Sequence, residues 1–238
     1  MHGARDGEPT GGGPSTGAAA QRGHAPQAYD TAVDLRDAIL AAGRRLAARG
    51  LIVASEGNLS VRLDGSRILI TPSGWSKDLL AAEDLVVVGV AHDAPIPVSV
   101  RGIAPSSDLA IHRAVYAARP DVDAVVHAHL PASLALTIVG RVPDPGLLPE
   151  TVHFLPRLPF VPYGHPGSED LAVRVAAALA DGIEPAAGAV LLERHGAVAV
   201  GRHLDEALNR IELVDLLCRV WRDVLLLGGE RAPPIAAG

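Results

Sequence analysis

Hydrophobic residues recur with helical spacing near both ends of the sequence. A 3.6-residue period of apolar positions predicts one helix over about 30–49, which ends at Gly50, and another over about 204–227, which ends at Gly228. The apolar positions are Val33, Ile39, Leu40 and Leu46 in the first helix, and Leu208, Ile211, Val214, Leu217, Trp221 and Val224 in the last. Shorter elements are expected between these two helices.

Short apolar runs separated by turn residues such as Asp64-Gly65 fill the middle of the chain. They predict strands over residues 58–63, 68–71, 85–90, 124–129, about 158–162, 189–193 and 197–201. Further helices are predicted from Ser106 or Ser107 to Arg119, over residues 131–139, and from Ser168 to Asp181. A Pro-rich connection precedes the strand near residue 158.

Helices arranged around a sheet with hairpins predict an α/β fold: a single-domain α/β/α sandwich whose central, mostly antiparallel sheet is flanked by helices. The domain is expected to span residues 29–230. Residues 1–28 are rich in Gly, Pro and Ala and predict a flexible tail, and residues 231–238 form a short second tail.

Composition narrows the class of protein. Apolar residues make up 48% of the chain, so a large core is expected, and the formal charge of −6 argues against nucleic acid as a partner. We find no signal-peptide pattern and no apolar run long enough to span a bilayer, so no membrane association is expected. The single cysteine, Cys218, is typical of a reducing, cytoplasmic setting. Because Lys77 is the only lysine, any Schiff-base mechanism would depend on it.

Three histidines are candidate metal ligands. His127 and His129 are two residues apart at the end of a predicted strand, so both side chains face the same way. His195 follows another strand, and Gly196 permits the tight turn that brings it toward the pair. Three histidines and one open position are typical of a catalytic zinc site. The alternative is a chance pair among ten histidines, and for the others an exposed or structurally satisfied side chain is expected.

Small polar residues gather at three sharp turns: Gly57-Asn58, Thr71-Pro72-Ser73-Gly74 and Ser106-Ser107. Their hydroxyls and backbone N–H groups suit a phosphate, and a helix dipole at the third turn favours an anion. Each turn taken singly is more typical of an ordinary turn or cap. Asp108, which follows the serines, is either a first-turn helix acid or a general acid/base beside a metal.

In this order, the motifs resemble the class II aldolase/adducin family. The resemblance is carried by Ser55–Ser60 with Arg62, Thr71–Gly74, Pro105–Asp108 with His112 and Tyr116, Arg119–Asp121, Val126–His129, Pro162-Tyr163 with Pro166–Ser168, and His195-Gly196 with Gly201. It implies an α/β/α fold and a C4-type homotetramer with active sites at subunit interfaces. It implies one Zn²⁺ per subunit on His127, His129 and His195, a phosphate cradle of Gly57, Asn58, Ser73, Gly74, Ser106 and Ser107, and an acid/base at Asp108.

The sequence departs from the best-known members of that family. Fuculose-phosphate aldolases carry Glu where this chain has Asp108, and one methylene less moves the carboxylate by about a bond length. The Ser-Ser-Asp form is similar to ribulose-phosphate 4-epimerases, but their further Asp and C-terminal Tyr have no match here. Glu150 lies where related sugar-phosphate dehydratases place an acid/base and is a further candidate for that role; a surface carboxylate is the alternative.

The resemblance therefore leads us to expect a zinc-dependent lyase with a small phosphorylated sugar as substrate. The expected reaction is reversible cleavage of a ketose 1-phosphate, similar to L-fuculose 1-phosphate, into dihydroxyacetone phosphate and a short aldehyde. The alternatives are a pentulose-5-phosphate 4-epimerase, and a sugar-phosphate dehydratase or decarboxylase. A non-catalytic, adducin-like scaffold is disfavoured because all three candidate metal ligands are present.

Overall fold

A seven-stranded sheet forms the middle of the molecule. The computed structural model describes residues 32–180 and 185–229, so the predicted tails 1–28 and 231–238 lie outside the described residues. The strands are ordered β3-β2-β1-β4-β7-β6-β5. All neighbours pair antiparallel except β5 and β6, which are parallel. The strands are β1 (Asn58–Arg62), β2 (Arg67–Ile70), β3 (Val86–Gly89), β4 (Ala124–Ala128), β5 (Phe160–Val161), β6 (Ala189–Leu192) and β7 (Gly196–Gly201).

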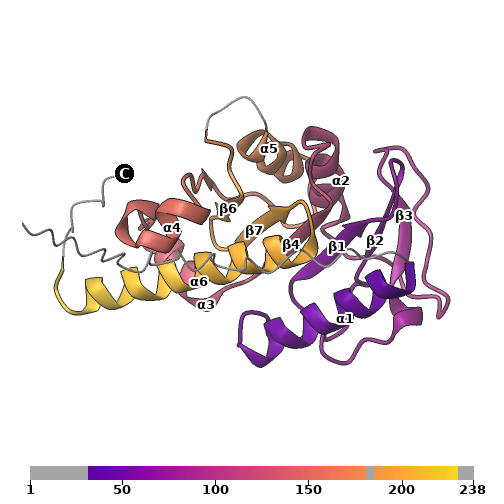
Figure 1. Cartoon of the computed structure of the whole chain (residues 1–238), viewed down its shortest axis with the longest axis horizontal. Helices are drawn as coiled ribbons and strands as arrows, with labels where there is room; N and C mark the ends of the chain where they lie inside the picture. The colour runs from indigo at the N-terminus through magenta and orange to yellow at the C-terminus, as the bar shows by residue number, and fades with distance from the viewer. Residues whose placement is uncertain (1–31, 181–184, 230–238) are drawn as a thin grey trace, which may run out of the picture.

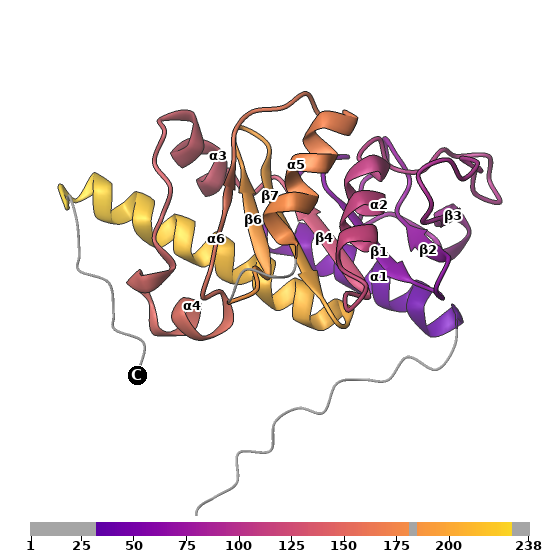
Figure 2. The ribbon, with the colours of Figure 1, turned by 90° about the horizontal axis from the view of Figure 1, so that it is seen from above.

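Helices cover both faces of this sheet, which gives the predicted α/β/α sandwich. Helices α1, α3 and α6 lie on one face, and α2 and α5 pack side by side on the other (Figure 1 and Figure 2). The helices are α1 (Ala32–Ala48), α2 (Leu109–Ala118), α3 (Pro131–Ile138), α4 (Pro149–Phe154), α5 (Glu169–Leu179) and α6 (Leu204–Leu226). Among the described residues, no helix is both long and apolar enough to cross a membrane.

Strand alternation divides the core into two apolar layers. In β4, Val126 packs with the helices of the α1 and α6 side, whereas Val125 packs with α2 and α5. Because successive side chains of a strand point to opposite faces, His127 lies on the same face as Val125. The histidine pair is therefore placed by a strand that is buried along its whole length.

The prediction was wrong in the Pro-rich connection between residues 140 and 157. This segment holds a 3-10 turn, η2 (Pro145–Leu147), and the short helix α4. A second 3-10 turn, η1 (Ala82–Asp84), precedes β3 and was also not predicted. Proline at the first helical position favours a helix start, but six residues are too few to show a helical period.

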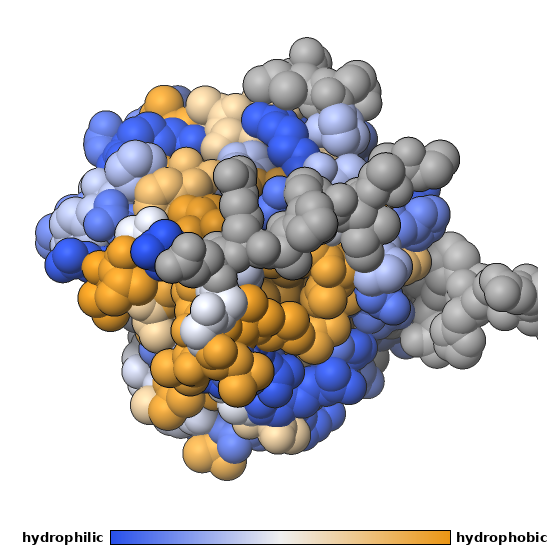
Figure 3. Space-filling model, turned by 90° about the vertical axis from the view of Figure 1, so that its left-hand side faces the viewer, coloured by the Kyte–Doolittle hydropathy of each residue, from blue (hydrophilic) through white to orange (hydrophobic). Residues whose placement is uncertain are grey.

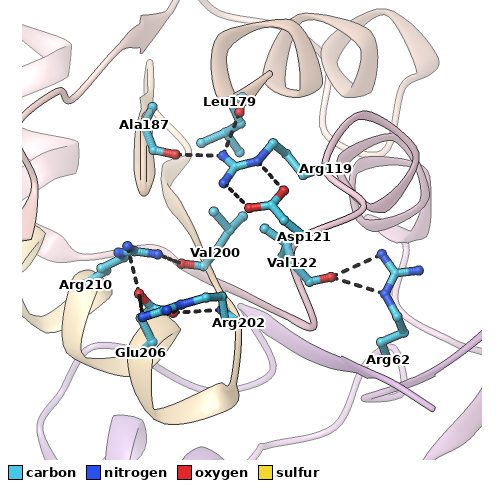
Figure 4. A network of polar contacts seen from close by, with 10 residues as sticks. All are labelled: Arg62, Arg119, Asp121, Val122, Leu179, Ala187, Val200, Arg202, Glu206 and Arg210. Atoms are coloured by element: carbon cyan, nitrogen blue, oxygen red, sulfur yellow. Dashed lines mark hydrogen bonds and ion pairs between the residues drawn. The ribbon is translucent and has the colours of Figure 1, made fainter. Parts of the chain in front are cut away.

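The turn that leads into β4 is held by an arginine network (Figure 4). The Arg119 guanidinium donates from Nη1 to the main-chain oxygens of Leu179 and Ala187, at 2.9 and 3.2 Å. Its other nitrogens pair with Asp121, with Nε 2.8 Å from Oδ1. This network ties the start of β4 to the end of α5 and the segment before β6, so the histidine strand has a fixed frame.

Candidate active site

Three histidine rings converge at one edge of the sheet. His127 is on β4, His129 directly follows that strand, and His195 lies in the turn between β6 and β7. Their ring centroids are 4.8–4.9 Å apart in every pair. One ring nitrogen from each lies within 4.8 Å of the others. The side chains that the sequence singled out as metal ligands therefore form one cluster.

Gly196 explains how His195 comes so close to the other two. Its φ is +99°, and an added Cβ would lie 2.2 Å from the Ala128 oxygen and 2.6 Å from the His129 Cα. Only glycine permits this approach of two backbones. The start of β7 therefore passes directly against the end of β4, which places His195 beside His129.

The rings are oriented as metal ligands require. His127 Nδ1 lies 2.9 Å from the Ala197 oxygen, and its buried Nε2 has no hydrogen-bond partner among the described residues. His129 Nδ1 lies 2.8 Å from a Glu56 carboxylate oxygen. Acceptors on one ring nitrogen leave the other with its lone pair free toward the cluster. Burial lowers the pKa of His127 to about 3 and also lowers that of His195, so both are neutral. This donor set fits a divalent metal ion.

Asp108 is held beside the histidines. Its Oδ1 accepts the Gly167 N–H at 3.1 Å, and its Oδ2 accepts Asn58 Nδ2 at 2.9 Å and lies 3.8 Å from His127 Nε2. Burial raises the pKa of this carboxyl, but the attraction of His127 and His195 in their protonated forms, together with the Asn58 amide, holds it below its usual value. The carboxyl group is therefore ionised, and it faces both the imidazole cluster and the cavity in front of it.

The six candidate phosphate-binding residues lie around one cavity. It has a volume of about 290 Å³ and is also lined by Asp108, His129 and His195. The phosphate-type residues are Gly57 and Asn58, Ser73 and Gly74, and Ser106 and Ser107. Two of the loops are joined: Ser73 N donates to the Ala104 oxygen and Ser106 N to the Thr71 oxygen. The N-terminal end of α2 opens onto the same cavity, which favours an anion there.

Glu150 lies elsewhere. It is in the first turn of α4 and lines a separate, larger cavity of about 870 Å³, together with residues of α6 such as Arg210 and Arg219. It is not among the residues that line the histidine cavity. Within a single chain, the structure therefore does not bring Glu150 to the other candidate residues.

Two further residues at the cavity were missed as site residues. Glu56 orients His129, and its other carboxylate oxygen accepts the Val53 N–H at 2.9 Å. Lys77 lines the cavity, and its Nζ lies 2.7 Å from each of the main-chain oxygens of Ser55 and Trp75. Two features of the sequence could have pointed to them: Lys77 is the only lysine, and Glu56 directly precedes Gly57-Asn58.

Comparison with known proteins identifies the class. The sequence matches the class II aldolase and adducin N-terminal domain over residues 37–222, so the chain belongs to this family. A 3-oxo-tetronate 4-phosphate decarboxylase of Haemophilus influenzae is 32% identical over 183 residues, which is 75% of this chain and 82% of the relative. A 5-methylthioribulose-1-phosphate/5-deoxyribulose-1-phosphate aldolase of Rhodospirillum rubrum is 33% identical over 208 residues, 84% of this chain and 86% of the relative.

The fold is shared with an enzyme of known structure. The crystal structure of L-fuculose-1-phosphate aldolase from Thermus thermophilus superposes with a TM-score of 0.68 and 32% identity. The match covers 83% of this chain and 98% of that chain. The chain is thus an enzyme of the class II aldolase superfamily, whose relatives named here act on sugar phosphates.

Proposed function

We propose that this chain is a metal-dependent lyase that decarboxylates a four-carbon 3-oxo sugar acid 4-phosphate to dihydroxyacetone phosphate. One observation carries the proposal. The ionised Asp108 carboxylate lies 3.8 Å from an unpartnered His127 nitrogen of a three-histidine cluster, in the wall of a cavity whose other walls are phosphate-type loops. The similarity to a decarboxylase of this substrate class supports this reaction over the expected cleavage of a fuculose-type ketose 1-phosphate.

Aldol cleavage of a ketose 1-phosphate is the second candidate, and the similarity to an aldolase over 84% of this chain favours it. The two reactions share their central chemistry. Decarboxylation breaks C1–C2 of the 3-oxo acid, and aldol cleavage breaks C3–C4 of the ketose. In both, the electron pair remains on the carbon next to a ketone, and the product is the enediolate of dihydroxyacetone phosphate.

A single divalent ion, for which we propose Zn²⁺, would be held by His127, His129 and His195 and would supply a Lewis acid for the negative charge of the enediolate. Asp108 would relay the proton: it would take one from solvent in decarboxylation, or from the C4 hydroxyl in aldol cleavage, and deliver it to the carbon that has lost CO₂ or the aldehyde. Lys77 Nζ is engaged with two main-chain oxygens, so it is not free to form an iminium with the substrate. The metal would serve as the electron sink instead.

The cradle would hold the phosphate group in the same cavity that His129 and His195 line. Hydrogen-bond donors for the phosphate would come from the hydroxyls of Ser73, Ser106 and Ser107 and from the N-terminal end of α2. These groups are uncharged, so they would add no permanent charge near the reacting carbon. Asn58 contributes differently from the expectation, since its amide already spans Asp108 and His112. Binding the phosphate in this cradle would orient the ketone toward the metal ligands.

A product assay tests the proposed function. The protein is incubated with 3-oxo-tetronate 4-phosphate, L-fuculose 1-phosphate and a pentulose 5-phosphate, while CO₂, aldehyde and dihydroxyacetone phosphate are measured. We expect CO₂ and dihydroxyacetone phosphate from the first substrate. Aldehyde release from the second would establish the second candidate instead. An epimerised pentulose, or loss of water without fragments, would contradict both.

Metal content is measured in the same experiment. Chelation is expected to lower turnover by at least about a hundredfold, and Zn²⁺ is expected to restore it. The variant His127→Ala should bind less metal and stay inactive after zinc is added. Full turnover of the chelated protein, with no bound metal detected, would exclude the proposed role of the cluster.

A further inference from the structure

A chain of buried polar side chains runs behind the cavity wall to Asp108. It links Tyr116, Ser60, His112 and Asn58 in that order, and all of these side chains are buried. The contacts are Tyr116 OH to Ser60 Oγ at 2.9 Å, Ser60 Oγ to His112 Nδ1 at 2.7 Å, and His112 Nε2 to Asn58 Oδ1 at 2.6 Å. The last link is Asn58 Nδ2 to Asp108 Oδ2 at 2.9 Å.

Two elements build this chain from their regular spacing. Asn58 and Ser60 are alternate residues of β1, so they face the same side of the sheet. His112 and Tyr116 are four residues apart on α2, so they lie one turn apart on one face of that helix. The helix packs over the strand, and four polar groups meet in an otherwise apolar layer.

The chemistry of the groups sets the direction of every hydrogen bond. An ionised Asp108 only accepts, so Asn58 must turn its NH₂ to it and its carbonyl to His112. Burial lowers the pKa of His112 to about 4, so the ring is neutral; its Nε2–H donates to Asn58 and its Nδ1 accepts from Ser60. Ser60 then accepts from Tyr116, and burial raises the pKa of this phenol, which keeps its proton. All four donors point toward Asp108.

We propose that His112 is a positioning residue, which acts through Asn58 to hold the Asp108 carboxylate in its place between the histidine cluster and the cavity. The inference rests on the proposed role of Asp108 in proton transfer. Gly167 N–H holds Oδ1 from one side, and the Asn58 amide holds Oδ2 from the other. Without His112, the buried Asn58 carbonyl loses its donor, so the amide is no longer fixed from that side and its Nδ2 can shift away from the Asp108 carboxylate. A shift of about 1 Å there is enough to slow proton transfer severely.

The test uses a reaction that every enediolate mechanism shares. Wild-type protein with dihydroxyacetone phosphate in D₂O should exchange a carbon-bound hydrogen, which ¹H NMR follows. The variant His112→Leu keeps the volume but makes no polar contact, and we expect exchange at saturation to fall at least about tenfold, with KM changed less than about threefold. His112→Gln, which can still donate an amide to Asn58, is expected to recover part of the rate. Bound metal should stay unchanged in both.

A milder variant keeps the test decisive if His112→Leu does not fold. Tyr116→Phe removes only the hydroxyl at the far end, and a several-fold loss of exchange is expected with KM unchanged. The control Val115→Ala, a buried apolar residue of the same helix, loses stability but should exchange at the wild-type rate at a temperature where it is folded. The inference is overturned if Tyr116→Phe and the folded His112 variants exchange at the wild-type rate. It is also overturned if the exchange rate of folded Val115→Ala falls as far as that of these variants.

Asp108→Asn separates this inference from the proposed function. Wild-type exchange by Asp108→Asn would show that another group moves the proton, and the proposed function would then fail at its acid/base. Loss of exchange in Asp108→Asn with full exchange in the His112 and Tyr116 variants would leave the function standing and remove only the positioning role.

Discussion

Asp108 shows how a shorter carboxylate can serve the site. Fuculose-phosphate aldolases, which the motifs resemble, have Glu at this place. The side chain of Asp108 is one methylene shorter, so its carboxylate must still come close to the histidines to act there. In the structure, Asp108 Oδ2 is 3.8 Å from His127 Nε2, and the residue lines the cavity. Hydrogen bonds from Asn58 and Gly167 fix both oxygens. The shorter side chain therefore reaches the histidine cluster because its surroundings hold it there.

Lys77 is a lysine buried in the described part of the chain. It is only 2% exposed, and its ammonium donates to main-chain oxygens of Ser55 and Trp75 at 2.7 Å. These oxygens belong to two separate loops that line the cavity. The lysine thus joins the loop before β1 to the loop after β2 and keeps a positive charge close to Glu56 and Asp108.

The burial of Lys77 predicts a pH dependence of stability. Burial lowers its pKa from the usual 10.5 to about 8, although Glu56 and Asp108 oppose this. Between these two values the unfolded chain binds more protons at this residue than the folded chain, so its contribution to the free energy of unfolding rises with pH, by at most about 1.4 kcal/mol per pH unit. Urea unfolding of wild type and Lys77→Met from pH 7.5 to 10 measures this contribution to the free energy of unfolding.

The comparison between the two proteins isolates the lysine. Buried Cys218 and Tyr116 have raised pKa values and make both proteins less stable at high pH, and this effect cancels in the difference. The stability of wild type relative to Lys77→Met should therefore increase above pH 8. Parallel pH curves for the two proteins would contradict a neutral Lys77 in the folded state.

At the scale of elements, one hairpin turn, the entry into β1 and one helix end assemble the site. The β6–β7 turn brings in His195, the loop before β1 and the first residue of that strand bring in Glu56 and Asn58, and the start of α2 brings in Asp108. Antiparallel pairing of β1 and β7 on either side of β4 brings these segments to the same edge of the sheet. The site therefore depends on how closely the neighbouring backbones can approach at that edge.

Gly196→Ala tests this close approach. The new Cβ would lie 2.2 Å from the Ala128 oxygen at a φ of +99°, so the two backbones must separate. We expect a loss of about 3 kcal/mol or more in the free energy of unfolding, together with weaker metal binding, measured by urea unfolding and metal titration.

Gly140→Ala is the matched control. Its φ is +69°, but nothing lies within 4 Å of the added Cβ, so it carries only the backbone strain of about 1–2 kcal/mol. Equal destabilisation of the two variants would show that the contact between β7 and β4 is not what requires glycine at residue 196.

At the scale of the whole molecule, one end of the domain is strongly apolar. The end that carries α4 and the C-terminal part of α6 shows a broad hydrophobic surface (Figure 3). Exposed apolar side chains of these segments include Phe154, Leu226 and Leu227, of which the last two are 78% and 88% exposed. Apolar patches of this kind commonly mark surfaces of association. They support the proposal, first made from the family resemblance, that the chain forms a homotetramer.

Light scattering after size-exclusion chromatography tests this assembly. We expect a particle of about four times the 24.6 kDa chain mass. The double variant Leu226→Asp, Leu227→Asp should shift the protein to smaller species, because burying two charges at an apolar contact is unfavourable. Val173→Asp, at an exposed position of α5, is the control and should leave the mass unchanged. A monomeric wild type at micromolar concentration would contradict the proposal.

Much of the fold was predictable because its signals are local. The helical periods of α1 and α6, the strand around His127 and the capping Ser168 of α5 depend only on near neighbours in the chain. The short helix α4 was missed because six residues carry no period, and Pro149 lies in the Pro-rich stretch that was predicted as a connection. The expected boundaries at residues 29 and 230 lie outside the described residues.

The sequence by itself determined which chemistry was available: two histidines at strand spacing, small residues for a phosphate, one acid after two serines and a glycine after His195. Only the tertiary structure decided which of these meet. It brought His195 to the pair, joined Glu56 to His129, linked His112 through Asn58 to Asp108, and put Glu150 at another cavity. The reason is that these contacts link segments more than 50 residues apart, or depend on the exact facing of side chains, which packing of the sheet and helices fixes and local periodicity does not encode.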